Sequence, residues 1–332
     1  MNKFIVITSI NKKTEAIKKY DKNGDWNLIV IGDKKTPNIK LNNGIYLSLR
    51  DQKKLNFKLI SSLPINSYQR INIGYLLALK NGADVIASID DDNIPLKNWG
   101  KNLLINKSLK TKALSSPTKF VDSLFEHKSI SNKNFWHRGF PLEHLTNRKF
   151  QKKKNKKNYF IEIEAGLWNI EPDVDAICRI SNGPFNLKFL NKLSIIDNKC
   201  YSPFDTQNVI LSKRIMPSMC LLTDIGRMCD IWASFISQRI LRNLNSNLAF
   251  TGPTVNHKRN IHNLKTDLFQ ETLGIKYSND LINLLEKIQF KKNSNVLQMY
   301  EKIINEMSKL KFISSKMTKF QNTWLNDVSK YF

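Results

Sequence analysis

The chain has 332 residues, of which 41% are hydrophobic, so it can form one large domain or a domain with an appendage. Its 12 glycines and 10 prolines are too few for a disordered or fibrous chain. The formal net charge of +25 favours an anionic partner, which could be nucleic acid, an anionic membrane surface or a substrate such as a nucleotide sugar. A lysine-rich surface without any such partner is the alternative.

The cysteines and the apolar segments point to a cytoplasmic protein. The four cysteines contain no CxxC pair and are not spaced like a disulfide scaffold, so reduced thiols fit best. The apolar run from Phe4 to Ile10 has only seven residues, which is too short for a signal peptide. No stretch approaches the ~20 apolar residues of a membrane span. We therefore expect a cytoplasmic location, and we leave peripheral contact at the inner face of a membrane open.

Strands and helices alternate in the first part of the chain. Short β-branched and apolar runs predict strands at residues 4–8, 26–31, 44–49 and 85–89. Helical spacing predicts helices at residues 14–20 and 67–81, the second ended by Asn81-Gly82. This alternation predicts an α/β fold with a mainly parallel central sheet flanked by helices. Ligands of such sheets bind beyond the carboxyl ends of the strands, where Thr8, Asp33 and the run Asp90-Asp91-Asp92 fall.

The rest of the chain is less regular. Residues 101–179 include a basic tract at 148–157, which we interpret as a solvated loop, with contact to an anionic lipid or acceptor as the alternative. From about residue 267 the apolar spacing predicts amphipathic helices, one through Leu281 to Ile288 and one through Met299 to Met307. We therefore predict two parts, an α/β domain over residues 1–265 and a C-terminal helical appendage over residues 266–332.

Three consecutive carboxylates follow the fourth predicted strand. Adjacent negative charges repel and raise one another's pKa unless a cation is present. Mn²⁺ and Mg²⁺ prefer oxygen ligands and can bridge a carboxylate to a diphosphate. Asp90 and Asp92 share a face of the strand. We predict Asp92 as the metal ligand, with Asp90 or Asp91 bonded to a ribose or ordering the site. An acidic turn without a ligand is the alternative.

Other carboxylates are candidates for acid–base chemistry or for sugar binding. Asp230 stands among apolar residues near Trp232 and could be a general base that deprotonates an acceptor hydroxyl. Alternatively, it starts a helix and pairs with Arg227. Asp173 and Asp175 could bind sugar hydroxyls or the acceptor, or they could form a turn that caps a helix.

Basic and histidine motifs supply further candidates. Arg138, beside Gly139 and aromatic residues, could hold a phosphate or stack on a sugar, and a surface loop is the alternative. His257 or His262 could complete a metal site with Asp92, while a structural or solvated histidine is the alternative for each. Nucleophile-elbow, GxGxxG and Walker A sequences are all absent, so hydrolase, redox, kinase and NTPase hypotheses lose support.

Seven stretches of the sequence, taken in order, resemble the STELLO-type family of glycosyltransferases. They lie at residues 26–37, 67–93, 136–142, 172–179, 203–208, 227–232 and 253–264, and together they span most of residues 1–265. A more distant similarity links the chain to the reversibly glycosylated polypeptides, which are UDP-arabinopyranose mutases. It rests on the aspartate triplet, on Arg138-Gly139 with Pro141, and on Gly166-Leu167-Trp168 before Asp173.

The STELLO-type resemblance implies a GT-A fold, a nucleotide-sugar donor and a divalent metal, Mn²⁺ or Mg²⁺, at the aspartate triplet. We place the nucleotide sugar at Thr8, Ser9, Asp33, Arg70, Asp90, Asp91, Trp168 and Asp173. We assign catalytic roles to Asp230, Arg138 and Asp175. We assign the metal to Asp92 with His257 or His262.

These assignments lead to three hypotheses of function. The first is a metal-dependent glycosyltransferase that moves a sugar from a nucleotide-diphosphate donor to a hydroxyl acceptor, in glycan or surface polysaccharide synthesis. The acceptor can be a glycan, a lipid-linked molecule or a protein. The second is a nucleotide-sugar mutase, which changes the ring form of the sugar without an acceptor. The third is a non-catalytic basic protein that binds nucleic acid or anionic lipid, and it leaves the acidic motifs unexplained.

Overall fold

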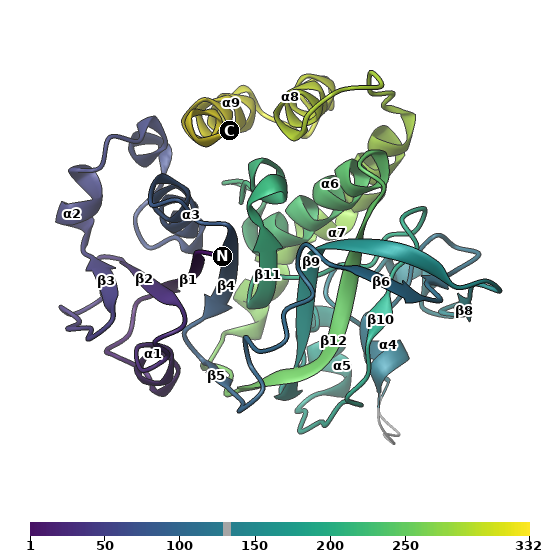
Figure 1. The fold of residues 1–332 in the computed structure, drawn as a ribbon, viewed down its shortest axis with the longest axis horizontal. Coiled ribbons are helices and arrows are strands. Elements are labelled where there is room, and N and C mark those ends of the chain that lie inside the picture. The colour runs from purple at the N-terminus through teal and green to yellow at the C-terminus, as the bar shows by residue number, and fades with distance from the viewer. Residues whose placement is uncertain (129–133) are drawn as a thin grey trace.

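The computed structural model describes residues 1–128 and 134–332, and one sheet organises them (Figure 1). Its strands are β1 Lys3–Ser9, β2 Asn27–Gly32, β3 Gly44–Leu47, β4 Val85–Asp90, β5 Asn93–Pro95, β6 Ser108–Thr111, β9 Lys157–Ile170, β10 Ser194–Ile195, β11 Asn208–Ser212 and β12 Ser246–His257. The strand order is β10-β12-β9-β11-β4-β1-β2-β3, with β5 on β12 and β6 on β9. A separate two-stranded sheet pairs β7 Leu114–Ser115 with β8 Gln151–Lys152.

The sheet is mixed, with a parallel N-terminal half. Strands β4, β1, β2 and β3 pair in parallel, and Thr8 lies level with both Ile31 and Asp90. In the other half, β11 pairs antiparallel with both β4 and β9, whereas β9 and β12 are parallel. The predicted mainly parallel arrangement therefore holds for the N-terminal half alone. The long strands β9 and β12 come from the part of the sequence that shows no regular alternation.

Helices cover the sheet on both sides. They are α1 Glu15–Tyr20, α2 Leu49–Lys53, α3 Ile71–Lys80, α4 Ser123–His127, α5 Ala176–Asn182, α6 Cys229–Asn243, α7 Leu264–Lys287, α8 Val296–Met307 and α9 Ser315–Val328. Helix α3 packs on β1 and β2, and Figure 1 shows α1 on the opposite side of these strands. The close approach needs Gly74, because a Cβ there would lie 2.3 Å from Cγ1 of Val6.

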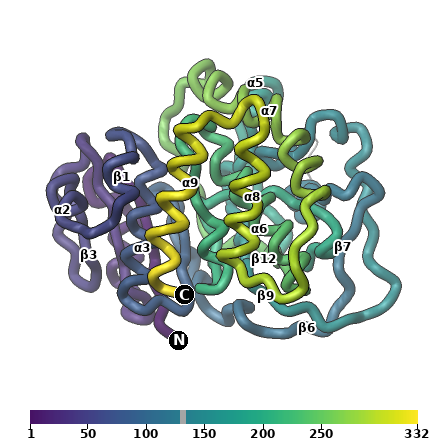
Figure 2. The backbone as a smooth tube through the Cα atoms, turned by 90° about the horizontal axis from the view of Figure 1, so that it is seen from above, coloured from purple at the N-terminus to yellow at the C-terminus, as the bar shows by residue number. Residues whose placement is uncertain are grey.

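The three C-terminal helices share a core with the rest of the molecule. Figure 2 shows α9 beside α3 and α8 over α6, and α7 packs on α5 and α6. The buried Trp324 of α9 donates from Nε1 to the carbonyl of Pro217 at 2.8 Å. Asp327 accepts a hydrogen bond of 2.8 Å from the backbone nitrogen of Leu59. The residues predicted as an appendage thus contact distant parts of the chain, and the division at residues 265/266 stays a prediction.

Most of the predicted local elements are present. Each of the four predicted strands and two predicted helices of the first part has its counterpart, namely β1 to β4, α1 and α3. The basic tract at 148–157 is exposed in most of its length, but it is wrong to call it a loop throughout, because it contains β8 and the first residue of β9.

Among the described residues, no helix is long and apolar enough to cross a membrane.

Strand β9 carries two buried carboxylates. Glu162 accepts hydrogen bonds from the hydroxyl of Ser212 and, at 3.0 Å, from Nη1 of Arg214. Glu164 accepts one of 2.8 Å from the backbone nitrogen of Leu104. Burial raises the pKa of Glu164 from 4.5 to about 7. Above neutral pH, Glu164 is ionised in a buried place, and this lowers the free energy of unfolding.

We predict that Glu164 makes the protein less stable as pH rises. The folded protein binds the Glu164 proton more tightly than the unfolded chain, so the free energy of unfolding falls between the ordinary pKa of 4.5 and about 7. Glu164→Gln should remove this part of the pH dependence in urea denaturation at pH 5 and pH 8. The exposed Glu301→Gln variant serves as the control. Equal pH dependence in wild type and Glu164→Gln would contradict the prediction.

We predict that Trp324→Ala lowers the free energy of unfolding by about 3–5 kcal/mol, because it removes a fully buried aromatic ring. Asn322→Ala, at an exposed position of the same helix, should change it by less than about 0.5 kcal/mol. Chemical denaturation followed by circular dichroism measures both. A separate early transition in Trp324→Ala would instead show that residues 266–332 unfold as an independent unit.

Candidate functional site

The carboxyl ends of β1 and β4 bring the first acidic group together. Asp90 ends β4 and lies in register with Thr8 of β1. Burial, together with the charges of Asp92 and Asp91, raises the pKa of Asp90 to about 8. Burial and the neighbouring carboxylates thus disfavour the ionised form of Asp90, as the sequence predicts for adjacent acidic groups.

Asp91 joins the ends of the two strands. Its carboxylate accepts a hydrogen bond from the hydroxyl of Ser9 and one of 3.0 Å from Nδ2 of Asn11. The hydroxyl of Thr14 donates to its backbone carbonyl at 2.7 Å. Thr14 is also the N-cap of α1, so the start of this helix is fixed against the acidic group. Asp91 thus orders the segment around Asp92.

Asp92 faces the end of β12, because β5 pairs with β12 and places Asn93 opposite His257. Nε2 of His257 lies 3.5 Å from Oδ2 of Asp92. Nδ1 of His257 lies 2.8 Å from the carbonyl oxygen of Glu171. A carbonyl can only accept a hydrogen bond, so Nδ1 carries a proton. Nε2, at the opposite side of the imidazole ring, faces Asp92. The loop after β12 adds the backbone nitrogen and Nδ2 of Asn260, both 3.1 Å from Asp92 Oδ2.

One oxygen of Asp92 has no hydrogen-bond partner. Oδ1 is buried and without a donor among the residues that the structure describes. A buried carboxylate oxygen without a partner costs about 1–3 kcal/mol or more. An oxygen of this kind beside an imidazole nitrogen is suited to a divalent cation. The structure therefore brings His257 to the predicted metal ligand. Nδ1 of His262 instead lies 3.2 Å from Oδ1 of Asp267.

A second buried group surrounds Arg138. Its two terminal nitrogens donate to the two oxygens of Asp230, both at 2.8 Å. Its Nε lies 3.0 Å from Oδ2 of Asp173 and 3.1 Å from Oδ1. Asp230 lies in the first turn of α6, as the helix-start alternative expects, but the pairing with Arg227 in that alternative is wrong. Arg227 pairs with Glu271 at 3.0 Å instead.

Glycine is required next to Arg138. Gly139 has a φ of +85°, and a Cβ there would lie 2.3 Å from Cγ2 of Ile231. The backbone can therefore turn tightly against α6 at this point. This close approach positions Arg138 over Asp230, one residue before Ile231.

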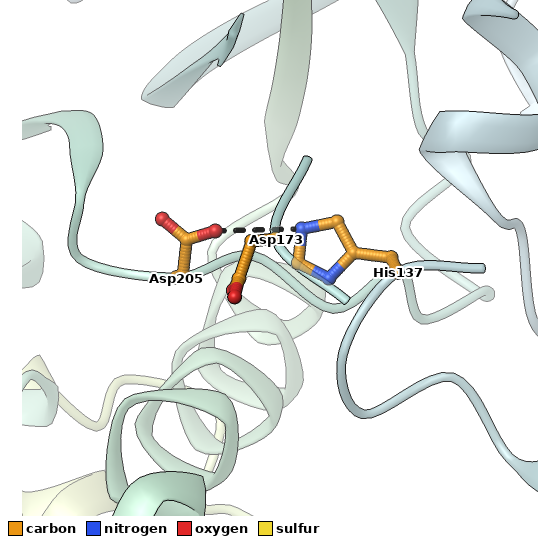
Figure 3. A group of neighbouring side chains, drawn as sticks. All are labelled: His137, Asp173 and Asp205. Atoms are coloured by element: carbon orange, nitrogen blue, oxygen red, sulfur yellow. Dashed lines mark ion pairs between the residues drawn. The ribbon is translucent and has the colours of Figure 1, made fainter. Parts of the chain in front are cut away.

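His137, Asp173 and Asp205 form a cluster behind Arg138 (Figure 3). Their side chains are 0%, 4% and 1% exposed. Nε2 of His137 lies 3.6 Å from Oδ2 of Asp205, and one ligand atom from each residue lies within 4.8 Å of the others. An imidazole and two carboxylates are a donor set that could hold a metal ion. His137 and Asp205 are not among the site residues predicted from the sequence, although both lie in stretches that resemble the STELLO-type family.

The two acidic groups adjoin one another. The carbonyl of Gln207 accepts hydrogen bonds from the backbone nitrogen of Asp90 at 3.0 Å and from Nδ2 of Asn93 at 3.3 Å. The backbone nitrogen of Gln207 donates to Asp205 at 2.8 Å. The charge of Asp230 also contributes to the raised pKa of Asp90. The residues just before β11 thus connect the aspartate triplet to the Arg138 cluster.

Asp33 and Arg70 are held by local contacts in the N-terminal half. Asp33 accepts hydrogen bonds from the backbone nitrogens of Asn66 at 2.8 Å and Ser67 at 3.0 Å. Arg70 donates from Nε to the side chain of Gln52 at 2.9 Å. Burial lowers the pKa of Arg70, and the charge of Asp33 opposes this shift. Both side chains are buried and held by contacts within the N-terminal half, and their predicted contact with a nucleotide stays a prediction.

Asp175 and Trp168 complete the set of predicted residues. Asp175 is the N-cap of α5 and accepts from the backbone nitrogen of Cys178 at 2.8 Å, as the helix-cap alternative expects. Its other oxygen accepts from Nε1 of Trp136 at 2.6 Å. Trp168 is buried, with its ring 5.7 Å from that of His137. Nε1 of Trp168 lacks a partner in the described part of the chain.

Three arginines lie together near His257, and the sequence analysis missed this group. Burial and the neighbouring charges of Arg179 and Arg227 lower the pKa of Arg259. Arg179 pairs with Glu171 at 2.5 Å, and Arg259 pairs with Asp267 at 2.9 Å. Several guanidinium groups in one place can bind a diphosphate. Only the three-dimensional fold brings them together, since they come from α5, the turn just before α6 and the loop after β12.

We predict that Arg138→Leu lowers the free energy of unfolding by about 3–5 kcal/mol, because it leaves the carboxylates of Asp173 and Asp230 buried without their cation. The control is Lys309→Leu, which breaks an exposed pair with Glu306 and should cost about 1 kcal/mol or less. Urea denaturation at pH 7 measures both variants. A loss as small as that of the control would show that Arg138 does not balance these charges.

Comparisons with known proteins agree with the resemblance seen in the sequence. A family model described as STELLO glycosyltransferases matches residues 227–331. "Probable glycosyltransferase STELLO2" of Arabidopsis thaliana is 25% identical over 356 residues, which cover 98% of this chain and 44% of that protein. "Probable glycosyltransferase STELLO1" of the same plant is 25% identical over 276 residues, covering 76% of this chain and 35% of that protein.

The chain thus spans less than half the length of either relative. The more distant similarity to the reversibly glycosylated polypeptides stays a prediction. The STELLO-type similarity has support from the family model over residues 227–331 and from two relatives. These matches confirm the predicted resemblance, and the chain is similar to the STELLO-type glycosyltransferases.

Proposed function

We propose that the chain is a metal-dependent glycosyltransferase of the GT-A type, with a nucleotide-diphosphate-sugar donor and a hydroxyl acceptor. The observation that carries this proposal is the carboxylate of Asp92, whose buried Oδ1 has no donor among the described residues and whose Oδ2 lies 3.5 Å from Nε2 of His257. The relatives' names support the transfer of a sugar. The mixed sheet flanked by helices is compatible with a GT-A fold.

Asp92 and His257 would hold Mn²⁺ or Mg²⁺ in this proposal. The hydrogen bond from Nδ1 of His257 to the carbonyl of Glu171 fixes the imidazole in the orientation that a metal ligand needs. A bound cation also relieves the repulsion that raises the pKa of Asp90. When bound, the metal supplies positive charge that stabilises the leaving diphosphate.

The arginines would contact the phosphates that the metal does not reach. Arg259 comes two residues after His257, and Arg227 and Arg179 lie close enough to lower its pKa. Each is already paired with a carboxylate, so a diphosphate would share its guanidinium group. Charge-assisted bonds of this kind strengthen as negative charge develops on the leaving group.

The nucleoside and the sugar would occupy opposite sides of the aspartate triplet. Thr8, Ser9, Asp33 and Arg70 lie on the parallel half of the sheet, where we place the nucleoside. Trp168 and Asp173 lie at and beyond the end of β9, where we place the sugar. This arrangement puts the catalytic unit in residues 1–265, with residues 266–332 as a packed extension.

Asp230 stays our candidate for the general base, with Arg138 and Asp175 as its neighbours in the catalytic group. Arg138 holds the Asp230 carboxylate in one orientation through two bonds of 2.8 Å. An acceptor hydroxyl would have to replace or share one of them. Asp175 reaches the same group indirectly, because it fixes the start of α5 two residues after Asp173.

Calorimetry with UDP, GDP and CDP sugars, with and without Mn²⁺, tests the proposed function. We expect metal-dependent binding of at least one donor by the wild type. Asp92→Asn and His257→Gln should weaken it by about 100-fold, because each removes a metal ligand or its partner. His262→Gln is the matched control, since this histidine lies in the same loop but pairs with Asp267. It should stay within about threefold of wild type.

Two outcomes would count against this proposal. The first is the absence of metal-dependent binding of all three donors. The second is retention of wild-type binding by a folded Asp92→Asn variant. If the isolated protein instead changes the ring form of a nucleotide sugar without an acceptor, chromatography of the donor will show a mutase in place of a transferase.

A further inference from the structure

We propose that His137, Asp173 and Asp205 form a second divalent-cation site, closed to solvent and suited to a tetrahedral ion such as Zn²⁺. This site is separate from the one assigned to Asp92 and His257, and its existence does not depend on the proposed sugar transfer. Its three residues come from three segments, which are the loop before Gly139, the turn between β9 and α5, and the turn before β11.

The spacing of the three side chains suits a bound ion. Figure 3 shows the imidazole of His137 and the carboxylate of Asp205 facing one another, with the side chain of Asp173 next to them. Nε2 of His137 and Oδ2 of Asp205 are 3.6 Å apart. Ligand bonds of about 2.0–2.1 Å in a tetrahedron separate neighbouring ligand atoms by roughly 3.3 Å. The distance between His137 and Asp205 therefore differs from that of a tetrahedral ion by a few tenths of an ångström, and the ligand atom of Asp173 lies within 4.8 Å of both.

Two facing atoms of this cluster have no partner. Nε2 of His137 and Oδ2 of Asp205 are both buried and both lack a hydrogen bond within residues 1–128 and 134–332. Nδ1 of His137 lies 2.8 Å from the carbonyl of Arg138, so it must carry the proton. Nε2 then presents a lone pair to a carboxylate oxygen. Two acceptors that face one another in a buried place require a cation or a shared proton between them.

The charges around Arg138 also favour a cation. Asp173, Asp205 and Asp230 are three buried carboxylates, and Arg138 bonds to the first and the third of them. If all are ionised, these four side chains carry an excess of two negative charges. A divalent cation balances this excess, and one imidazole nitrogen with two carboxylate oxygens is a donor set that Zn²⁺ accepts.

An ion at this point would fix the position of Arg138. His137 precedes Arg138 directly, and Asp173 is bonded to its Nε. The ion would therefore join the two segments that orient the guanidinium group toward Asp230. Its role would be structural, since the cluster has almost no exposed surface. Closed sites of this kind contribute to folding rather than to the reaction.

A cobalt titration of the full chain, after removal of metals with a chelator, tests the proposal. We expect the wild type to bind Co²⁺ with the intense visible absorption of a tetrahedral ion. His137→Gln and Asp205→Asn should lose one equivalent of this ion. Asp92→Asn should keep it, because its carboxylate belongs to the other site. His262→Gln is the control for loss of a histidine outside both sites.

A second measurement uses the unmodified binding residues, so it does not depend on the folding of those variants. The indole of Trp168 lies 5.7 Å from the imidazole of His137, so Co²⁺ in the cluster should quench its fluorescence. The quenching should persist in Asp92→Asn and disappear in Trp168→Phe. Absence of any ion beyond the one that needs Asp92, or unchanged stoichiometry in Asp205→Asn, would overturn the proposal in favour of a shared proton. Either result leaves donor binding through Asp92 unaffected, so the two proposals fail separately.

Discussion

The contact of Arg138 with Asp173 and Asp230 is the constraint on which the candidate site depends. Three segments distant in the sequence meet there, and their charges are buried, so none can move without leaving a charge unpaired. The geometry needs Gly139, because its backbone approaches α6 too closely for a side chain. One arginine thus connects the turn after β9 to the start of α6. The neighbouring Asp205 and Gln207 extend the connection to the end of β4.

The end of β4 shows a different situation, with three adjacent carboxylates and the imidazole of His257, which lies 3.5 Å from Asp92. Asp91 is stabilised by hydrogen bonds from Ser9 and Asn11, whereas Asp90 has a pKa raised to about 8 by burial and by its neighbours. Asp92 retains a buried oxygen without a donor in the described ranges. Repulsion that persists in a folded chain costs stability, and the cation site that we propose would explain why it is tolerated.

The sequence predicts the parts of this arrangement that local patterns determine. Apolar runs and helix caps predict β1 to β4, α1 and α3, and the position of the aspartate triplet at a strand end follows from them. The sequence does not predict that Asp230 pairs with Arg138 instead of Arg227. Only the fold shows which of the two arginines reaches the Asp230 carboxylate. His137 and Asp205 are 68 positions apart, and no periodic pattern relates them. No separate helix is predicted at α9, although its buried residues Met317, Phe320, Trp324 and Val328 lie at helical spacing.

The two candidate metal positions differ in exposure, and this difference separates their roles. The side chains of Asp92 and His257 are 12% and 5% exposed, next to the exposed loop at Lys258 and Asn260. Those of His137 and Asp205 are 0% and 1% exposed. Catalytic metal sites keep a coordination position open to substrate, whereas structural sites are closed by protein ligands. On this physical criterion, the donor diphosphate that we propose would reach Asp92 from solvent. The proposed ion behind Arg138 would instead hold Asp173 and Arg138 in place while the diphosphate binds.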